Sequence, residues 1–234
     1  LVSYTKLSPN HSGKRKHAID TISIHCMAGN LSVERCGELF QNKERQASSN
    51  YGIGSDGRIG LYVDEANRSW CTSSASNDNR AVTIEVANTV AKDPWPVSDA
   101  AYKSLIDLLV DICQRNGIPR LLWKGDKNLV GQVDRQNMTV HRWFANKSCP
   151  GNWMYARMGD LAAKVTAALG AAAEPGTQST DANFDTKNGS NRQAVEDANG
   201  NAVNLQDGKY KILDVVNCAV GTDDDMTIGT EVFS

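Results

Sequence analysis

The stretch VHRWFANKSCPG, residues 140–151, places His141 and Cys149 eight residues apart. Upstream, the segment TISIHC at residues 21–26 alternates like a short strand and puts His25 near its end. Two histidines and one cysteine make a three-ligand zinc set, which leaves the fourth position of a catalytic zinc ion open for water. A structural zinc ion normally takes four ligands with close cysteine pairs such as CxxC, which this chain lacks. The spacing alone leaves open that a cysteine here is simply buried.

Strand and helix patterns alternate through the first 170 residues. Residues 21–25 and 80–88 alternate apolar and polar side chains like half-buried strands, and Glu85 projects from the face opposite the Val/Ile stripe. An amphipathic helix is expected at 98–116, with Ser98 as its N-cap and Gly117 as its stop, and a final helix at 155–169. Shorter strands are expected at residues 57–63 and 121–123. These patterns predict an α/β domain with a central mixed β-sheet flanked by helices.

Four segments, in this order, resemble one enzyme family. They are HCMAG at residues 25–29, SNYGI at 49–53 followed by Asp56-Gly57, TIEVAN at 83–88, and the stretch 141–151. Together they resemble the zinc-dependent N-acetylmuramoyl-L-alanine amidases, the peptidoglycan amidases of phage endolysins and bacterial autolysins, which are related to peptidoglycan recognition proteins. The likeness is closest to endolysin-type members from clostridial bacteria and their phages, and it covers roughly residues 8–169.

The resemblance implies roles for six residues: zinc ligands His25, His141 and Cys149, the general base Glu85, and the oxyanion donors Lys147 and Tyr51. Alternatives remain for two of them. Glu85 can instead be a salt-bridged strand carboxylate, and Tyr51 can instead be a core residue. One departure from the family concerns Cys71, which stands where many relatives carry a histidine. This position is not one of the three expected ligands, so the departure bears on the substrate groove and not on the metal set.

The implied reaction is hydrolysis of the amide bond between N-acetylmuramic acid and the L-alanine of the stem peptide in peptidoglycan. One alternative is a recognition module that binds peptidoglycan without cleaving it, and Cys149 argues against this because non-catalytic relatives typically lack the thiol ligand. Another is a structural zinc protein or a different zinc hydrolase, which would lack the accompanying Tyr51, Glu85 and Lys147. The sequence leaves open whether the protein is an endolysin or an autolysin.

The charge of the chain is unevenly distributed. The net charge of −2 divides into +5 for residues 1–170 and −7 for residues 171–234. A mildly basic front part suits an anionic polymer such as the bacterial wall, although an ordinary mixed surface explains it as well. No basic stripe interleaved with aromatic residues indicates nucleic-acid binding. No apolar run approaches the roughly 18 residues that a membrane span needs, so membrane insertion is not expected.

Six cysteines are spread along the chain without a compact pattern. We therefore expect mostly free thiols in a protein made in a reducing cytosol, which would act on the cell wall after release by phage or secretion without a visible signal peptide. Whether Cys26, Cys36 and Cys71 form any disulfide stays open.

The expected domain organisation has three parts: a catalytic domain at 1–173, a polar linker at 174–200 and a small β-rich tail at 201–234. The linker is assigned from its Gly, Ser, Thr, Asn and Asp content. The tail regains strand-like runs and is a candidate for wall binding or for self-association.

Overall fold

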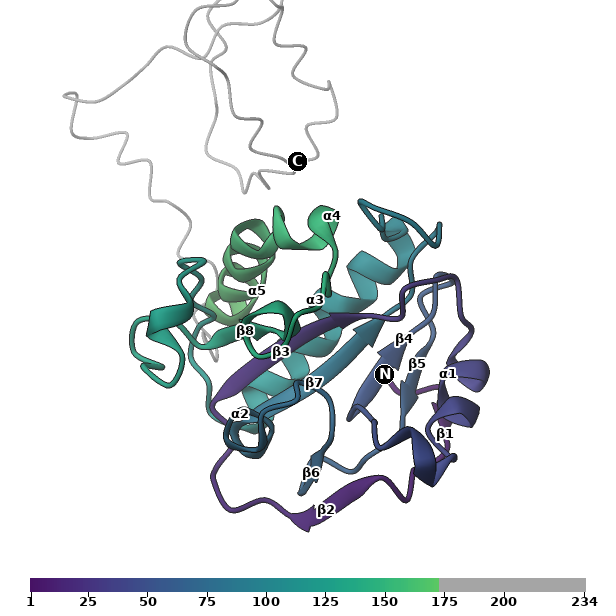
Figure 1. Cartoon of the computed structure of the whole chain (residues 1–234). Helices are drawn as coiled ribbons and strands as arrows, with labels where there is room; N and C mark the ends of the chain where they lie inside the picture. Colours follow the sequence, from purple (N-terminus) through teal and green to yellow (C-terminus); the bar gives the residue numbers. More distant parts are fainter. Residues whose placement is uncertain (173–234) are drawn as a thin grey trace, which may run out of the picture. The chain divides into compact units, whose positions relative to one another are not determined.

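A computed structural model describes residues 1–172 of the chain (Figure 1). Its strands are β1 (Tyr4–Thr5), β2 (His11–Lys14), β3 (Thr21–Cys26), β4 (Tyr51–Ile53), β5 (Ile59–Leu61), β6 (Asn67–Ser69), β7 (Ala81–Val86) and β8 (Met138–Val140). Its α-helices are α1 (Val33–Leu39), α2 (Ala75–Arg80), α3 (Asp99–Arg115), α4 (Asn152–Tyr155) and α5 (Met158–Ala172). Three short 3₁₀ helices are η1 (Lys43–Arg45), η2 (Lys127–Leu129) and η3 (His141–Trp143).

Six strands form a mixed sheet in the order β1-β5-β4-β7-β3-β8, and β2 pairs with β6 in a separate ribbon. Only β4 and β5 run antiparallel within the large sheet, while β4, β7, β3 and β8 are parallel neighbours. Helices α3 and α5 lie side by side against the sheet in Figure 1. The predicted fold class, a central mixed sheet flanked by helices, is confirmed.

The core lies between the sheet and helices α3 and α5. Ile22, Ile24 and Ile84 from the strands are fully buried there with residues such as Leu105 and Val165 from the helices. The opposite face of β3 is also buried, although its alternation predicted a half-buried strand. The β3 side chains on that face, Thr21, Ser23 and His25, are polar, and each takes part in a hydrogen bond.

Helix α3 forms as its sequence predicts. The Ser98 hydroxyl accepts a hydrogen bond of 3.1 Å from the backbone N–H of Ala101, which is N-capping. Gly117 follows the helix with φ +66°, and the N–H of Ile118 then returns to the carbonyl of Cys113 at 2.8 Å. Glycine adopts this left-handed conformation without the steric cost that a side chain would add.

No strand forms at residues 121–123, so the strand prediction for this segment is wrong. Two side chains bind the backbone N–H groups in this segment: Thr166 from α5 accepts from Leu121 at 2.9 Å, and Asn137 accepts from Leu122 at 2.7 Å. Side-chain acceptors thus replace a strand partner here. The final helix also differs, because the chain forms two helices, α4 and α5, in place of one helix at 155–169.

Several expectations concern the remaining residues. The linker at 174–200 and the tail at 201–234 lie outside the described residues, so both assignments stay predictions. No helix within residues 1–172 is long and apolar enough to cross a membrane. In the same part of the chain five cysteines are free thiols: Cys26, Cys36, Cys71, Cys113 and Cys149.

Candidate active site

The expected ligand and base residues meet at the carboxyl ends of β3 and β7. In the parallel pairing of these strands, His25 lies directly opposite Glu85. Their neighbours Ile24 and Ile84 point into the core beneath α3, so strand alternation puts His25 and Glu85 on the other face of the sheet. An imidazole and a carboxylate therefore lie next to each other at this edge.

His25 is held by two contacts. Its side chain is almost fully buried, with Nε2 3.1 Å from the hydroxyl of Ser23 and Nδ1 3.5 Å from Sγ of Cys149. Burial, together with the nearby His141, lowers the pKa of His25 well below its ordinary value. The imidazole is therefore neutral near pH 7, which is the form that binds a metal ion.

His141 and Cys149 come from the segment after β8, the strand that pairs with the far side of β3. His141 begins η3, and its ring centroid lies 5.2 Å from that of His25. Its Nε2 lies 3.2 Å from the hydroxyl of Ser73. The Sγ of Cys149 also accepts a 3.4 Å hydrogen bond from the backbone N–H of Cys26.

Arg142 closes the loop between His141 and Cys149. Its backbone N–H donates to the carbonyl of Cys149 at 3.1 Å, and its guanidinium donates to the carbonyl of Ser148. These bonds hold the two ends of the loop together. His141 and Cys149, eight residues apart in sequence, are therefore close in space.

The three residues fit a zinc ion. Their donor atoms all lie within 4.8 Å of one another. Zinc bonds of about 2.0–2.3 Å in a tetrahedron hold neighbouring ligand atoms roughly 3.3–3.8 Å apart. The 3.5 Å between Nδ1 of His25 and Sγ of Cys149 falls in that range. Two nitrogens and one sulfur are also the donor types that zinc takes in protein sites.

Glu85 has one oxygen that its surroundings leave free. Oε1 lies 3.9 Å from Sγ of Cys71, a long thiol hydrogen bond. Oε2 is buried and has no hydrogen-bond partner among the described residues. Burial raises the pKa of Glu85 well above its ordinary value. No basic side chain forms a salt bridge with it in the described part of the chain, so the salt-bridge alternative has no support.

Lys147 lies on the exposed part of the same loop, two residues before Cys149. Burial lowers the pKa of His141, and the charge of Lys147 lowers it further. Lys147 thus lies at the surface of the loop that carries His141 and Cys149.

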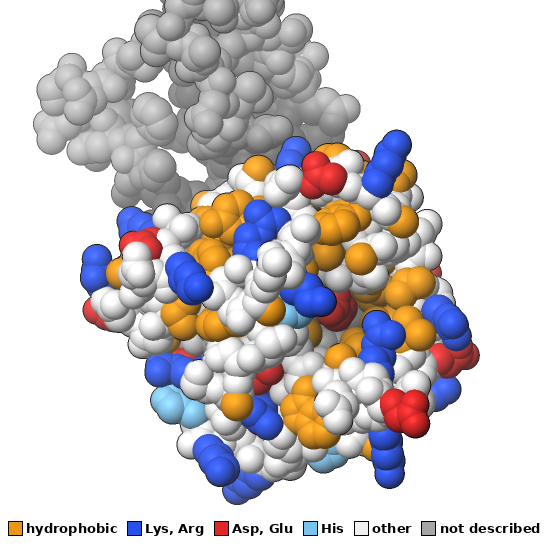
Figure 2. Space-filling model, viewed as in Figure 1, with side chains coloured by type: hydrophobic (Ala, Val, Ile, Leu, Met, Phe, Trp, Pro, Cys, Tyr) orange, Lys and Arg blue, Asp and Glu red, His pale blue; other side chains and the backbone are white. Residues whose placement is uncertain are grey.

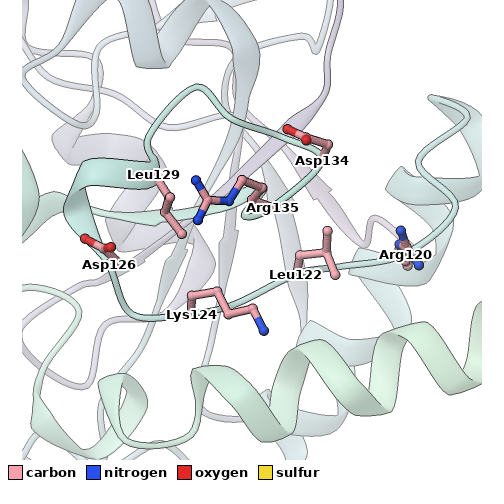
Figure 3. A pocket seen from close by; sticks show the side chains of 7 residues that line it. All are labelled: Arg120, Leu122, Lys124, Asp126, Leu129, Asp134 and Arg135. Carbon is pink, nitrogen blue, oxygen red and sulfur yellow. The ribbon is translucent and has the colours of Figure 1, made fainter.

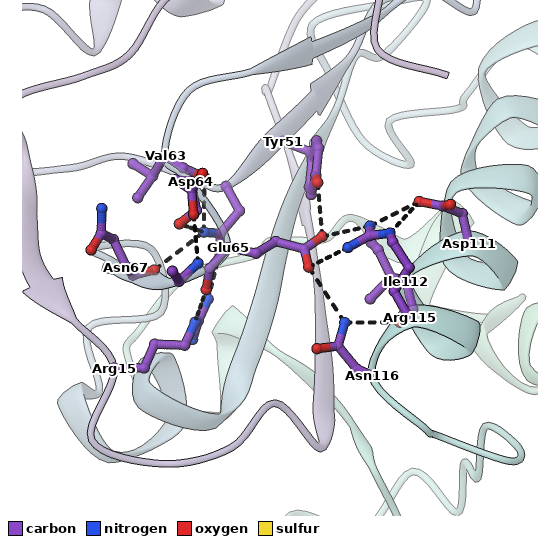
Figure 4. Close-up of polar contacts among 12 residues, drawn as sticks. Arg15, Tyr51, Val63, Asp64, Glu65, Asn67, Asp111, Ile112, Arg115 and Asn116 are labelled. Carbon is purple, nitrogen blue, oxygen red and sulfur yellow. Dashed lines mark hydrogen bonds and ion pairs between the residues drawn. The ribbon is translucent and has the colours of Figure 1, made fainter.

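The structure does not bring Tyr51 to the site, which corrects its assignment as an oxyanion donor. In the sheet Tyr51 pairs with Ile84, whereas Gly52 pairs with Glu85. The Tyr51 hydroxyl instead donates to Glu65 at 2.7 Å, and Figure 4 shows this carboxylate bound in turn by Arg115. Tyr51 is a buried residue on the helix-covered face, the alternative that its sequence left open.

Sequence reasoning missed several neighbours of the ligands. Ser23 lies two residues before His25, so the strand period alone could have placed its hydroxyl on the same face. Ser73 and the thiol of Cys71 arrive on the connection between β6 and α2. The sequence placed Cys71 only near the substrate groove and gave no signal for Ser73, because only tertiary folding brings that connection to the sheet.

A separate surface pocket of about 570 Å³ lies along the segment 120–135 (Figure 3). It is lined by Arg120, Leu122, Lys124, Asp126, Leu129, Asp134 and Arg135, none of which belongs to the site.

Figure 2 shows lysine and arginine side chains scattered over this view of the molecule, with hydrophobic groups between them. On the face shown, the basic side chains of the described residues form no continuous stripe.

The model of the N-acetylmuramoyl-L-alanine amidase family matches residues 15–152, more than half of the chain. The chain belongs to this amidase family. The resemblance carried by its four motifs is thus confirmed. A search of curated proteins found no match to the amidase.

Several solved structures are similar to the amidase, and that of PlyL shares its fold. The structure of PlyL matches with a TM-score of 0.51 at 13% identity, covering 70% of this chain and 97% of the other. LysC of Clostridium intestinale matches with a TM-score of 0.44 at 20% identity, covering 70% and 94%. The Drosophila peptidoglycan recognition protein SD matches with a TM-score of 0.48 at 15% identity, covering 68% and 94%.

Proposed function

We propose that this amidase is a peptidoglycan hydrolase that cleaves the amide bond between N-acetylmuramic acid and the L-alanine of the stem peptide, with zinc held by His25, His141 and Cys149. The observation that carries the proposal is the convergence of these three donors beside Glu85 in a chain of the amidase family. When bound at such a site, zinc polarises the scissile carbonyl and activates water.

Glu85 is the proposed proton carrier. Its Oε2 has no partner within the described residues, so it is free to accept the proton of the attacking water. Its raised pKa allows it to hold that proton until the C–N bond breaks, when the leaving amine of L-alanine takes it. The products are a muramic acid with a free lactyl carboxylate and a peptide with a free amino terminus.

Lys147 is the proposed oxyanion donor. Water attack places negative charge on the carbonyl oxygen, and a cation aimed at that oxygen stabilises it. The exposed ammonium of Lys147 is not engaged in a salt bridge with any described carboxylate, so it is available to substrate. Because Tyr51 faces the core, its hydroxyl does not share this role, and Lys147 is the one side chain proposed for it.

The site geometry favours hydrolysis over recognition alone. A binding module needs neither a thiol in the ligand set nor a buried carboxylate with a free oxygen, and this chain has both. The proposed place of action is the bacterial cell wall, as for an endolysin or an autolysin.

Mass analysis of digested wall fragments tests the proposal. Purified peptidoglycan treated with the protein should release glycans with unsubstituted muramic acid and peptides that begin with L-alanine. Glu85→Gln is the matched control, because it keeps the shape of the side chain and removes the base. Cleavage at a glycosidic bond or at another peptide bond would overturn the proposed reaction, as would identical products from the control.

A further inference from the structure

A second group of three donors overlaps the proposed zinc site. The donor atoms of His25, Cys71 and Glu85 also lie within 4.8 Å of one another. They come from β3, from the connection between β6 and α2, and from β7. His25 belongs to both groups, whereas the other two residues have no part in the first.

Cys71 is fixed at this place by a buried hydrogen-bonding arrangement. Its backbone N–H donates to the carboxylate of Asp78 at 3.1 Å, and the backbone N–H of Thr72 donates to the same group at 3.2 Å. Asp78 lies in α2 and is itself buried, so this connection is anchored below the surface. Cys71 is only 8% exposed, and its thiol points at Oε1 of Glu85.

The chemistry of this group suits a divalent cation. Imidazole nitrogen, thiolate sulfur and carboxylate oxygen are all zinc ligands. One thiolate and one carboxylate neutralise a doubly charged ion, which favours its entry into a buried place. Among residues 1–172, Oε2 of Glu85 has no hydrogen-bond partner, and because buried carboxylate oxygens are normally paired, this oxygen is available to a cation.

We propose that His25, Cys71 and Glu85 form an alternative site for a thiophilic divalent cation such as zinc or cobalt. The inference rests on the proposed function in one respect, namely that the first group is the zinc site of the active enzyme. Since both groups draw on the same imidazole, an ion held in one weakens the other. An ion in the alternative site also takes up the carboxylate of Glu85, so the chain with metal there is inactive.

Substitution of Cys149, the thiol of the first group, allows metal binding at the second group to be measured separately. Cys149→Ser should be prepared with cobalt in place of zinc, because a thiolate bound to cobalt gives a charge-transfer absorption in the near ultraviolet. We expect this variant to keep the thiolate–cobalt absorption and close to one metal ion per chain after desalting. The double variant Cys149→Ser/Cys71→Ser should lose the absorption and bind the metal roughly 10-fold or more weakly.

Two further double variants make the assignment specific. Cys113 is a buried core residue of helix α3, so Cys149→Ser/Cys113→Ser should keep the absorption. Cys26 lies next to Cys149, so Cys149→Ser/Cys26→Ser tests the nearest competing thiol and should also keep it. Loss of the absorption in the Cys26 variant, or its survival in the Cys71 variant, overturns the proposal.

A second measurement needs only the single variant. In Cys149→Ser, zinc should slow the alkylation of Cys71 by at least 10-fold relative to the zinc-free protein, and more than it slows that of Cys113, as mapped by mass spectrometry. Equal slowing at both thiols overturns the inference. Absence of metal from the wild-type protein would instead contradict the proposed function, whereas a metal-free Cys149→Ser beside a zinc-loaded wild type contradicts only the alternative site.

Discussion

Sγ of Cys149 lies 3.5 Å from Nδ1 of His25, although 124 residues separate them along the chain. The imidazole sits at the end of β3, and the thiol arrives on a loop that Arg142 closes after β8. Because β3 and β8 are direct neighbours in the sheet, the loop that follows β8 begins beside His25. The contact is therefore a consequence of the sheet order, and it brings the proposed ligands within zinc-binding distance.

Removal of the metal should abolish activity. The purified protein should contain close to one zinc ion per chain, and a strong chelator should remove both the zinc and the wall-lysing activity, which added zinc restores. Acid should act in the same direction, because protons compete with the metal for imidazole and thiolate. Metal analysis together with turbidity of a wall suspension checks this. Full activity of the metal-free protein would contradict the zinc mechanism.

Glu85→Gln should separate chemistry from structure. We expect turnover to fall roughly 100-fold or more, because the amide cannot accept the proton of the attacking water. Zinc content should stay at the wild-type level, since Glu85 is not one of the three proposed ligands. Glu38→Gln, at an exposed position in α1, is the matched control and should leave turnover unchanged. Wild-type turnover in Glu85→Gln would show that another group is the base.

Lys147→Ala should lower turnover by roughly 100-fold, because charge on the carbonyl oxygen loses its cation. Lys147→Arg should recover part of the loss by restoring a positive charge. The control is Lys127→Ala, another exposed lysine that lies outside the site in η2. Steady-state kinetics on soluble muropeptides distinguishes a loss in kcat from a loss in binding. If Lys147→Ala raises only KM, the residue binds substrate and does not stabilise the oxyanion.

Tyr51→Phe should leave turnover unchanged and lower stability. The substitution removes the hydroxyl that donates to Glu65 at 2.7 Å, and a hydrogen bond to a charged group contributes about 1.5–3 kcal/mol. We expect the free energy of unfolding to fall by roughly that amount in denaturant titrations. A large loss of turnover with unchanged stability would return Tyr51 to the active site.

The stability that Glu65 provides should depend on pH. Burial alone would raise the pKa of Glu65, but hydrogen bonds from Arg115 and Tyr51 outweigh it, and the pKa is lowered. A carboxyl group with a lowered pKa stabilises the fold above its unfolded pKa of about 4.3, and loses this contribution as pH falls through the folded value. Glu65→Gln should therefore be less stable than wild type at pH 7, and the difference should shrink towards pH 3.

Thermal unfolding of both proteins at several pH values measures this difference. Asp107→Asn is the control, because its partner Lys103 is largely exposed and the pair contributes little. A gap between wild type and Glu65→Gln that stays constant from pH 7 to pH 3 would contradict the prediction.

By itself, the sequence determined the family, the α/β fold class and helix α3 with its caps, and it proposed His25, His141 and Cys149 as metal ligands. These features depend on local signals: the period of apolar residues, the capping serine and glycine, and motifs whose side chains keep fixed spacings. Only the tertiary structure decided which residues of other strands and connections lie beside His25 and Glu85. Tyr51 belongs to a family-like segment, yet Gly52 is the residue that pairs with Glu85, and Tyr51 turns to Glu65. Likewise Cys71 reaches Glu85 because the buried carboxylate of Asp78 anchors the connection between β6 and α2. Strand register and loop anchoring are long-range properties, since a shift of one residue moves a side chain to the other face.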